Sequence, residues 1–306
     1  IPKGINRPKK TMEISTSISP KDKVSSIIRK VIALYLVGFN TIRLKVKGER
    51  LPIERREEIK SSIRRMLVGT EIISDSKDEM VLQVLLSSPE LSVSDALRRI
   101  AIIAVSMHKD AVDSLRDMNF ELAKEVINND DEIDRFSFYV IRQLKAAVED
   151  EKMLREIDLD NPKDCLGYRL ITKSAERVAD HAVNIALNVL TIKNPIDDDI
   201  FKALNEMSSK AILEFEDAMI SLFTKHYSLA DEVVEKKKLI ESYETELIGQ
   251  IIRKKLDAET ASTLRLIIES IKRTSEYGSD IAEVVLNLTA LKPEQETDQS
   301  RDKNNI

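Results

Sequence analysis

The chain contains few of the residues that make turns and cross-links. Its 306 residues include seven glycines, eight prolines, one cysteine and no tryptophan, and aromatic residues account for 4%. Scarce glycine and proline disfavour sandwiches and barrels, which need many turns, and favour long helices. The single cysteine, Cys165, excludes an internal disulfide framework and is typical of a reducing compartment such as the cytoplasm.

Long hydrophobic runs are also missing. No apolar segment approaches the roughly 20 residues that span a bilayer, and there is no signal peptide pattern, so we expect a cytoplasmic protein without membrane insertion. The chain begins without an initiator Met, and its opening IPKGINRPKK is basic. We interpret residues 1–10 as a linker and expect a further segment to precede them in the natural protein.

Charge is distributed unevenly along the chain. Residues 1–90 contain 18 Lys and Arg and 11 Asp and Glu, which gives +7. Residues 91–306 contain 30 and 42, which gives −12. This division indicates two modules with different partners.

The first module alternates between two periodicities. Apolar residues recur at every second position in some segments, which predicts strands, and at every third or fourth position in others, which predicts helices. The strands are expected in 11–19, in 41–47, in EIISDS and in EMVLQVLLS, and the helices in 21–37 and 52–68. Gly38 and Gly69 are expected to end the two helices. The order β-α-β-α-β-β predicts a small α/β domain over residues 11–88, with a mixed or mostly antiparallel sheet.

The segment TIRLKVKG has one apolar and one basic face. The residues predicted to point inward are Ile42, Leu44 and Val46, and those predicted to point outward are Arg43, Lys45 and Lys47. A basic strand face can bind nucleic acid, but no aromatic residue is interleaved here. We therefore interpret the face as solvated.

From Ser92 onward the sequence predicts helix only. Six long amphipathic helices are expected, at 93–117, 120–148, 162–192, 197–224, 228–255 and 260–290. The polar end of the chain, residues 291–306, is predicted to be disordered.

An internal repeat relates the first three of these helices to the last three. Residues 110–126 and 217–233 are identical at eight of 17 positions at an offset of 107, and the third helices align at an offset of 100. We therefore predict a mainly α fold. It consists of two tandem three-helix-bundle repeats, at 92–192 and 193–290, preceded by the small α/β domain.

The third helix of each repeat carries two carboxylates four residues apart. These are Glu176 and Asp180 in the first repeat and Glu276 and Asp280 in the second. Residues at this spacing lie on one helix face, where like charges repel. Apolar residues flank the first pair, so partial burial is expected, and partly buried carboxylates need cations.

The second helix of the first repeat offers a matching pair, Asp130 and Asp134. If neighbouring helices run antiparallel, this pair lies at the height of the pair on the third helix. The four carboxylates then form an oxygen-rich site for a divalent or ferric ion, with Asn184 as an outer ligand. The sequence leaves the metal open among iron, zinc, nickel and magnesium.

The second repeat departs from this pattern. Lys237 stands at the position of Asp130, and Glu241 stands at the position of Asp134. An ammonium group there can neutralise the acids without a metal. We expect either an ion pair or a weaker metal site with Glu241 as a ligand.

Other chemistry finds little support. The sequence has no phosphate-binding glycine loop and no nucleophile elbow. The histidines His108, His181 and His226 lack the Glu-x-x-His spacing of carboxylate-bridged di-iron proteins. Cys165 stands at a predicted helix start and is interpreted as a packing residue.

The stretches DDEID, ERVADHAVNIA and EYGSDIAEVVLNL resemble motifs of the PhoU family of phosphate-uptake regulators. The resemblance covers residues 92–290 and implies a fold of two three-helix repeats. It also implies metal binding by Asp130, Asp134, Glu176, Asp180, Glu276 and Asp280.

The segment 11–88 is similar to the α/β segment of archaeal-type members that carry an AbrB-like DNA-binding domain ahead of it. That domain is not in this sequence, so the resemblance implies DNA binding only through an absent domain.

The resemblance implies a non-catalytic adaptor that restrains phosphate uptake through a phosphate ABC transporter or a sensor kinase. Two alternatives from other classes remain open: a metal-carboxylate enzyme built in the bundle, and a helical scaffold whose acids are merely solvated. The enzyme would need a substrate pocket and usually a histidine ligand, for which the sequence gives no sign. The oligomeric state stays open, a homodimer included.

Overall fold

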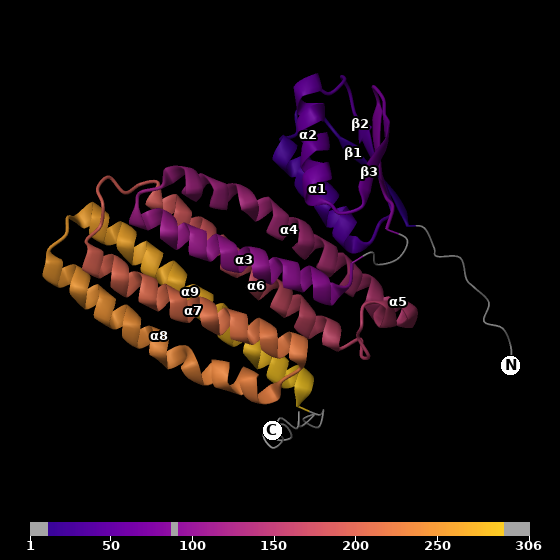
Figure 1. Cartoon of the computed structure of the whole chain (residues 1–306). Coiled ribbons are helices and arrows are strands. Elements are labelled where there is room, and N and C mark those ends of the chain that lie inside the picture. Colours follow the sequence, from indigo (N-terminus) through magenta and orange to yellow (C-terminus); the bar gives the residue numbers. More distant parts are fainter. Residues whose placement is uncertain (1–11, 87–90, 291–306) are drawn as a thin grey trace, which may run out of the picture. The chain divides into compact units, whose positions relative to one another are not determined.

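The computed structural model describes residues 12–86 and 91–290, apart from the side chain of Lys237 (Figure 1). Contacts within the chain divide it into two compact units. The first unit is Ile1–Ala104 with Glu125–Ala179, and the second is Val105–Lys124 with Asp180–Ile306. The boundary passes through three of the long helices. The predicted linker 1–10 and the predicted disordered tail 291–306 lie outside the described residues.

A small mixed sheet opens the first unit. Its strands are β1 Glu13–Ile18, β2 Thr41–Val46, β3 Thr70–Asp75 and β4 Glu79–Val84. The sheet order is β1-β2-β4-β3, with β1 and β2 parallel and the other neighbours antiparallel. Helices α1 Val24–Val37 and α2 Ile53–Met66 lie on one side of the sheet (Figure 1). The elements follow one another in the order that the sequence predicts.

The alternation in β2 decides which face of the sheet is buried. Ile42 and Leu44 are fully buried in the core between the sheet and the two helices, and Lys45 is exposed. Arg43 forms ion pairs with Glu13 on β1 and Glu79 on β4. Acids of the same sheet thus neutralise part of its basic outer face, which supports the interpretation of that face as solvated.

Helix α1 ends at Gly38, as its sequence predicts. Gly38 has a φ of 112°, a left-handed conformation that glycine adopts without a Cβ clash. Its N–H donates to the carbonyl of Tyr35 at 3.1 Å, and the N–H of Phe39 donates to the carbonyl of Leu34 at 3.3 Å. These bonds satisfy carbonyls that a helix end leaves open.

Helix α2 ends earlier than predicted. The sequence places its end at Gly69, but the helix stops at Met66, because Leu67 is already extended and its side chain is buried in the core. Gly69 instead takes a left-handed φ of 66° directly before β3. Burial of one leucine therefore ends the helix two residues earlier than the glycine signal predicts.

Helices make up the described residues from Val93 onward, and no strand occurs among residues 91–290 that the structure describes. The helices are α3 Val93–Arg116, α4 Phe120–Glu149, α5 Glu151–Glu156, α6 Asp164–Val189, α7 Asp198–Thr224, α8 Tyr227–Lys254 and α9 Ala258–Thr289. The six long helices lie where the sequence predicts them. The short α5 is an addition. Its N-cap Asp150 accepts bonds from the N–H groups of Lys152 at 2.9 Å and Met153 at 3.4 Å.

In the second unit, α7, α8 and α9 pack side by side (Figure 1). A glycine on α9 permits a close approach to α7, because a Cβ added at Gly278 would lie 3.1 Å from backbone atoms of Phe215. Phe215, Ile271 and Ile281 are fully buried in this part of the molecule. The apolar faces of the three helices therefore form the core of the second unit.

In the first unit, one buried arginine joins the α/β elements to α4. Arg142 is 7% exposed. Its guanidinium donates to the carbonyls of Tyr35, of Gly38 at 3.2 Å and of Phe39 at 3.0 Å, at the C-terminal end of α1. It also lies over the Tyr35 ring, with 4.8 Å between Cζ and the ring centroid. A cation at this helix end is favoured by the helix dipole and satisfies open carbonyls.

We expect Arg142→Met to lower the free energy of unfolding by about 2–4 kcal/mol, because three buried carbonyls lose a charged donor. Chemical denaturation followed by circular dichroism measures this loss. The control is Arg135→Met, which removes an exposed arginine from the same helix and should change the free energy of unfolding by less than about 0.5 kcal/mol. Equal losses in both variants would contradict the role of Arg142 as a helix cap.

Candidate functional site

The acid pairs of the first repeat occupy half-buried helix positions, which for Glu176 and Asp180 is the burial predicted from their apolar neighbours. Asp130 and Asp134 lie one turn apart on α4, and Glu176 and Asp180 lie one turn apart on α6. Asn184, one turn further along α6, is exposed. The boundary between the two compact units falls immediately before Asp180. The convergence of the four carboxylates therefore stays a prediction.

Glu176 has a cation of its own helix beside it. Lys173 Nζ lies 2.6 Å from Glu176 Oε2, and the Glu176 side chain is mostly buried. A metal ion at Glu176 would compete with this ammonium group for the carboxylate. The sequence analysis did not identify Lys173, although its spacing of three from Glu176 is that of a helical ion pair.

The donor chemistry of the first repeat suits a hard cation, because the predicted ligands supply oxygen atoms alone. Within the part of the chain that the structure describes, no group of three or more His, Cys, Asp or Glu side chains is arranged to hold a metal ion. The metal site remains a prediction. It rests on the four-residue spacing of the carboxylates, on their half-buried positions and on the oxygen ligands that they supply.

The corresponding residues of the second repeat lie on α8 and α9. Glu276 is half-buried, whereas Asp280 and Glu241 are exposed. Arg273 Nη1 lies 2.7 Å from Glu276 Oε2, which repeats the pairing of Lys173 with Glu176. The predicted role of Lys237 concerns a side chain that lies outside the described residues.

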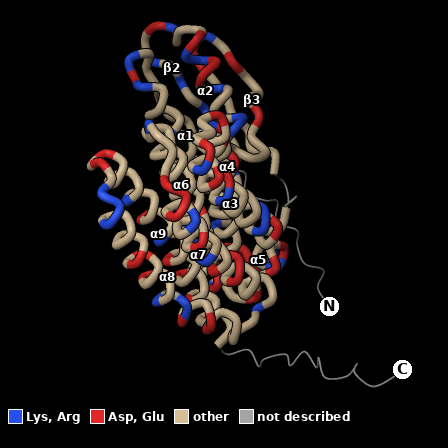
Figure 2. The backbone as a smooth tube through the Cα atoms, turned by 60° about the vertical axis from the view of Figure 1, so that its left-hand side comes forward, with Lys and Arg blue, Asp and Glu red and all other residues tan. Residues whose placement is uncertain are grey.

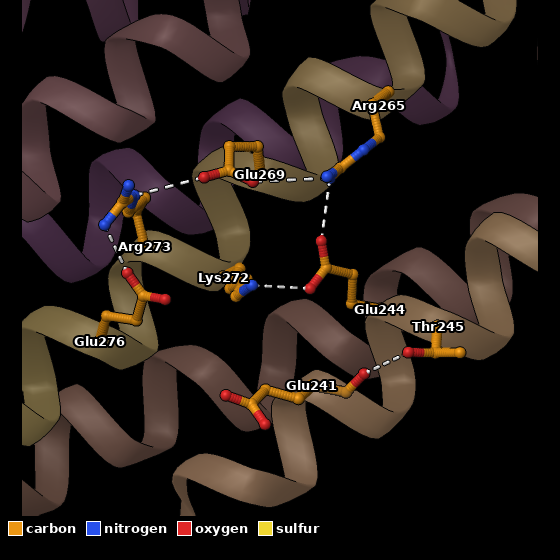
Figure 3. Close-up of polar contacts among 8 residues, drawn as sticks. All are labelled: Glu241, Glu244, Thr245, Arg265, Glu269, Lys272, Arg273 and Glu276. Carbon is orange, nitrogen blue, oxygen red and sulfur yellow. Dashed lines mark hydrogen bonds and ion pairs between the residues drawn. The ribbon is translucent and has the colours of Figure 1, made fainter.

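Glu276 stands at one end of a chain of ion pairs that joins α8 and α9 (Figure 3). We call it the α8/α9 ladder, and its members in order of contact are Lys272, Glu244, Arg265, Glu269, Arg273 and Glu276. The successive contacts measure 2.9, 2.9, 3.5, 3.3 and 2.7 Å. The sequence analysis missed this ladder. The spacings 265, 269, 273 and 276 within one helix are a signal that could have found its α9 part.

A histidine that the sequence analysis considered only as a metal ligand lies fully buried in the second unit. His108 on α3 has its Nε2 2.8 Å from Ser208 Oγ on α7 and its Nδ1 3.3 Å from Thr274 Oγ1 on α9. Burial, with smaller effects of Lys109 and His181, lowers the pKa of His108 from 6.5 to about 4. The neutral imidazole thus links three helices through both ring nitrogens.

A second buried polar contact joins α7 to α9. Glu214 is almost completely buried and accepts a hydrogen bond from the hydroxyl of Ser275. Burial raises the pKa of Glu214. The interface between α7 and α9 is therefore partly polar, which the apolar periodicity of these helices does not reveal.

Two further side chains, Cys165 and His181, lie on α6. Cys165 is buried at the start of α6, and burial raises the pKa of its thiol, which disfavours a reactive thiolate. The ring of His181 lies 5.7 Å from the ring of Tyr277, centroid to centroid.

The fold and the acid pairs define a class of protein. It is a helical-bundle protein with one carboxylate pair on α6 and another on α9. The sequence model described as the PhoU domain matches residues 97–189 and 204–285, one match in each repeat. The chain belongs to the PhoU domain family.

The chain is similar to proteins from several bacteria. The chain is 24% identical over 203 residues to the phosphate-specific transport system accessory protein PhoU homolog 1 of Thermotoga maritima, covering 63% of this chain and 83% of that protein. It is 25% identical over 167 residues to the PhoU homolog of Aquifex aeolicus, covering 53% and 74%. Its fold is similar to that of the phosphate transport system regulatory protein PhoU from Streptococcus pneumoniae. That likeness has a TM-score of 0.55 and 20% identity over 64% of this chain and 92% of that one.

Two further findings concern membrane-spanning helices and the distribution of charge. No helix within residues 12–86 and 91–290 is long and apolar enough to cross a membrane. Acidic and basic residues are interspersed along the long helices (Figure 2).

We expect His108 to make stability fall in mild acid. The unfolded chain takes up a proton at this residue near pH 6.5, whereas the folded chain does so only near pH 4. The contribution is therefore complete above pH 6.5 and is lost as the pH falls to 4. The loss amounts to about 3 kcal/mol of the free energy of unfolding.

Denaturation of His108→Gln across this range should show a shallower pH dependence than the wild type. The control is His226→Asn, which keeps a side-chain acceptor at the exposed N-cap of α8 and should leave the pH dependence unchanged. An unaltered slope in His108→Gln would show that the buried imidazole titrates normally.

Proposed function

We propose that the protein regulates phosphate transport as a non-catalytic adaptor in the cytoplasm. The observation that carries this proposal is the double match of the PhoU domain, which extends over both helical repeats. Both relatives named above are accessory proteins of phosphate-specific transport systems. An adaptor needs surfaces for partners, and long helices with mixed charges supply them.

The partner in this proposal is the ATPase of a phosphate ABC transporter or a phosphate-sensing histidine kinase. The segment 12–86 corresponds in the proposal to the α/β segment of archaeal-type members that are fused to an AbrB-like domain. A transcriptional role would then belong to such a separate domain. The pairing of Arg43 with Glu13 and Glu79 supports this division of labour, because it leaves less positive charge on the sheet for nucleic acid.

Metal binding is a further part of the proposal. Asp130, Asp134, Glu176 and Asp180 would hold a divalent or ferric ion, with Asn184 as an outer ligand. The ion would supply positive charge to carboxylates at half-buried positions, where repulsion between like charges is costly. Iron, zinc, nickel and magnesium all accept ligands of this chemistry.

We expect a restraint on phosphate uptake. In cells that lack their own protein of this family, expression of the chain together with its cognate transporter should lower the initial rate of radiolabelled phosphate uptake in phosphate-rich medium. Co-purification from the same cells identifies the partner as the transporter ATPase or the kinase. An unchanged uptake rate, with the protein present at normal levels and bound to neither partner, would refute the proposal.

We expect Glu176→Gln combined with Asp180→Asn to remove bound metal from the purified protein, because it takes away two of four anionic ligands. Elemental analysis after metal loading and dialysis measures the content per chain. The matched control is Asp231→Asn with Glu235→Gln, an exposed pair at the same spacing on α8. The metal assignment fails if the first double variant retains the full metal content.

A further inference from the structure

The α8/α9 ladder bears on how many metal sites this chain has. Its six members alternate in charge from one end to the other, and each carboxylate contacts at least one cation (Figure 3). Three carboxylates and three basic groups sum to a net charge of zero. We infer that the protein's own cations neutralise the carboxylates of the ladder, so that the second repeat takes up no metal ion at Glu276.

The carboxylate at the centre of the ladder, that of Glu244, contacts two cations. Glu244 is 8% exposed, and its two oxygens lie 2.9 Å from Arg265 Nη1 and 2.9 Å from Lys272 Nζ. Burying a carboxylate at this depth is costly, and close positive charge offsets the cost. Because both of its oxygens already have a cation, Glu244 can join a metal site only by giving up one of these contacts.

The cations of the ladder lie in direct contact with its carboxylates. Arg273 Nη1 is 2.7 Å from Glu276 Oε2. A divalent ion near Glu276 would therefore lie close to a positively charged guanidinium. Like charges repel at such distances even when solvent screens them.

Most of the ladder residues have no counterpart of the same charge in the first repeat. At the offsets of the internal repeat, Glu244 corresponds to Ser137 and Lys272 corresponds to Thr172, so the central ion pair is replaced by two hydroxyl groups. Ser137 and Thr172 are buried. Of the ladder contacts, only the pairing of Arg273 with Glu276 has a counterpart, in Lys173 with Glu176. The equivalent acids Glu176 and Glu276 therefore have the same kind of partner, and the two repeats differ in the central ion pairs of the ladder.

Glu241 adds no donor to the ladder. Its carboxylate is exposed and stands apart from Glu244 and Glu276 in the close-up (Figure 3). Its backbone carbonyl accepts a bond from Thr245 Oγ1 at 2.9 Å, as in an ordinary helix turn. A secondary metal ligand at this position would have to turn away from solvent to reach Glu276.

The first experiment measures metal content. The full chain is stripped with chelator, loaded separately with Mg²⁺, Zn²⁺, Ni²⁺ or Fe³⁺, and dialysed. The variant Glu276→Gln with Asp280→Asn should retain the wild-type content per chain. A fall in content in this variant would overturn the inference, whatever the first repeat binds.

The second experiment measures thermal unfolding in the presence of chelator. Lys272→Met with Arg273→Met leaves the ladder with three carboxylates and one cation, Arg265, and the melting temperature should fall by about 3–6 °C. The control is Lys193→Met with Lys254→Met, which breaks surface ion pairs of the same unit and should shift it by about 1–2 °C or less. Equal shifts in the two variants would show that the ladder is not an internal source of positive charge.

A double-mutant cycle separates the ladder from incidental contacts. Glu244→Gln should recover part of the melting temperature lost in Lys272→Met, because it removes the acid that has lost a partner. Strictly additive losses would count against the ladder. These tests remain decisive if the wild-type protein binds no metal at all: the metal proposal for the first repeat would then fail, while the stability measurements would still uphold or overturn the inference.

Discussion

A carboxylate on a half-buried helix face needs a cation beside it, and this constraint governs the interior of the helical body. Glu176 meets it with Lys173, and Glu276 meets it with Arg273. Deeper in the second repeat, Glu244 requires two cations. The equivalent acids Glu176 and Glu276 are thus each paired with a basic residue three positions earlier on the same helix, whereas Glu244 has no acidic counterpart in the first repeat.

Buried polar groups also need partners, and this requirement explains how the α/β part is attached to α4. The C-terminal carbonyls of α1 face the guanidinium of Arg142 rather than water. An arginine satisfies several acceptors at once with a rigid planar group. In the second unit, His108 plays a comparable role in its neutral form, because its two ring nitrogens reach Ser208 and Thr274 on different helices. Polar side chains therefore fix the relative positions of elements whose apolar packing alone would permit sliding.

Regulation fits a molecule built in this way. A protein that conveys the state of a transporter needs no catalytic group, but it needs elements whose contacts respond to charge. The ladder and the buried imidazole are two such elements, and they respond to different variables: ionic partners and protons. Ion pairs at half-exposed positions are individually weak, so small changes in these variables can shift which contacts persist.

The sequence by itself determined the helices, the strands and the repeat. Long amphipathic segments with few glycines and prolines leave little alternative to helix, and the order of the small α/β part follows from period-two and period-three-to-four patterns. It also determined the acid pairs, because residues four apart on a helix share a face. Only the tertiary structure decided where α2 ends, since burial of Leu67 outweighs the signal of Gly69. It alone showed that Arg142 caps α1, that His108 is buried among hydroxyl groups, and that Glu244 joins α8 to α9 through Arg265 and Lys272. The physical reason is that a charge pattern along one helix fixes its neighbours on that helix, whereas its partners on another helix depend on the rotation and register of packing, which the local sequence does not encode.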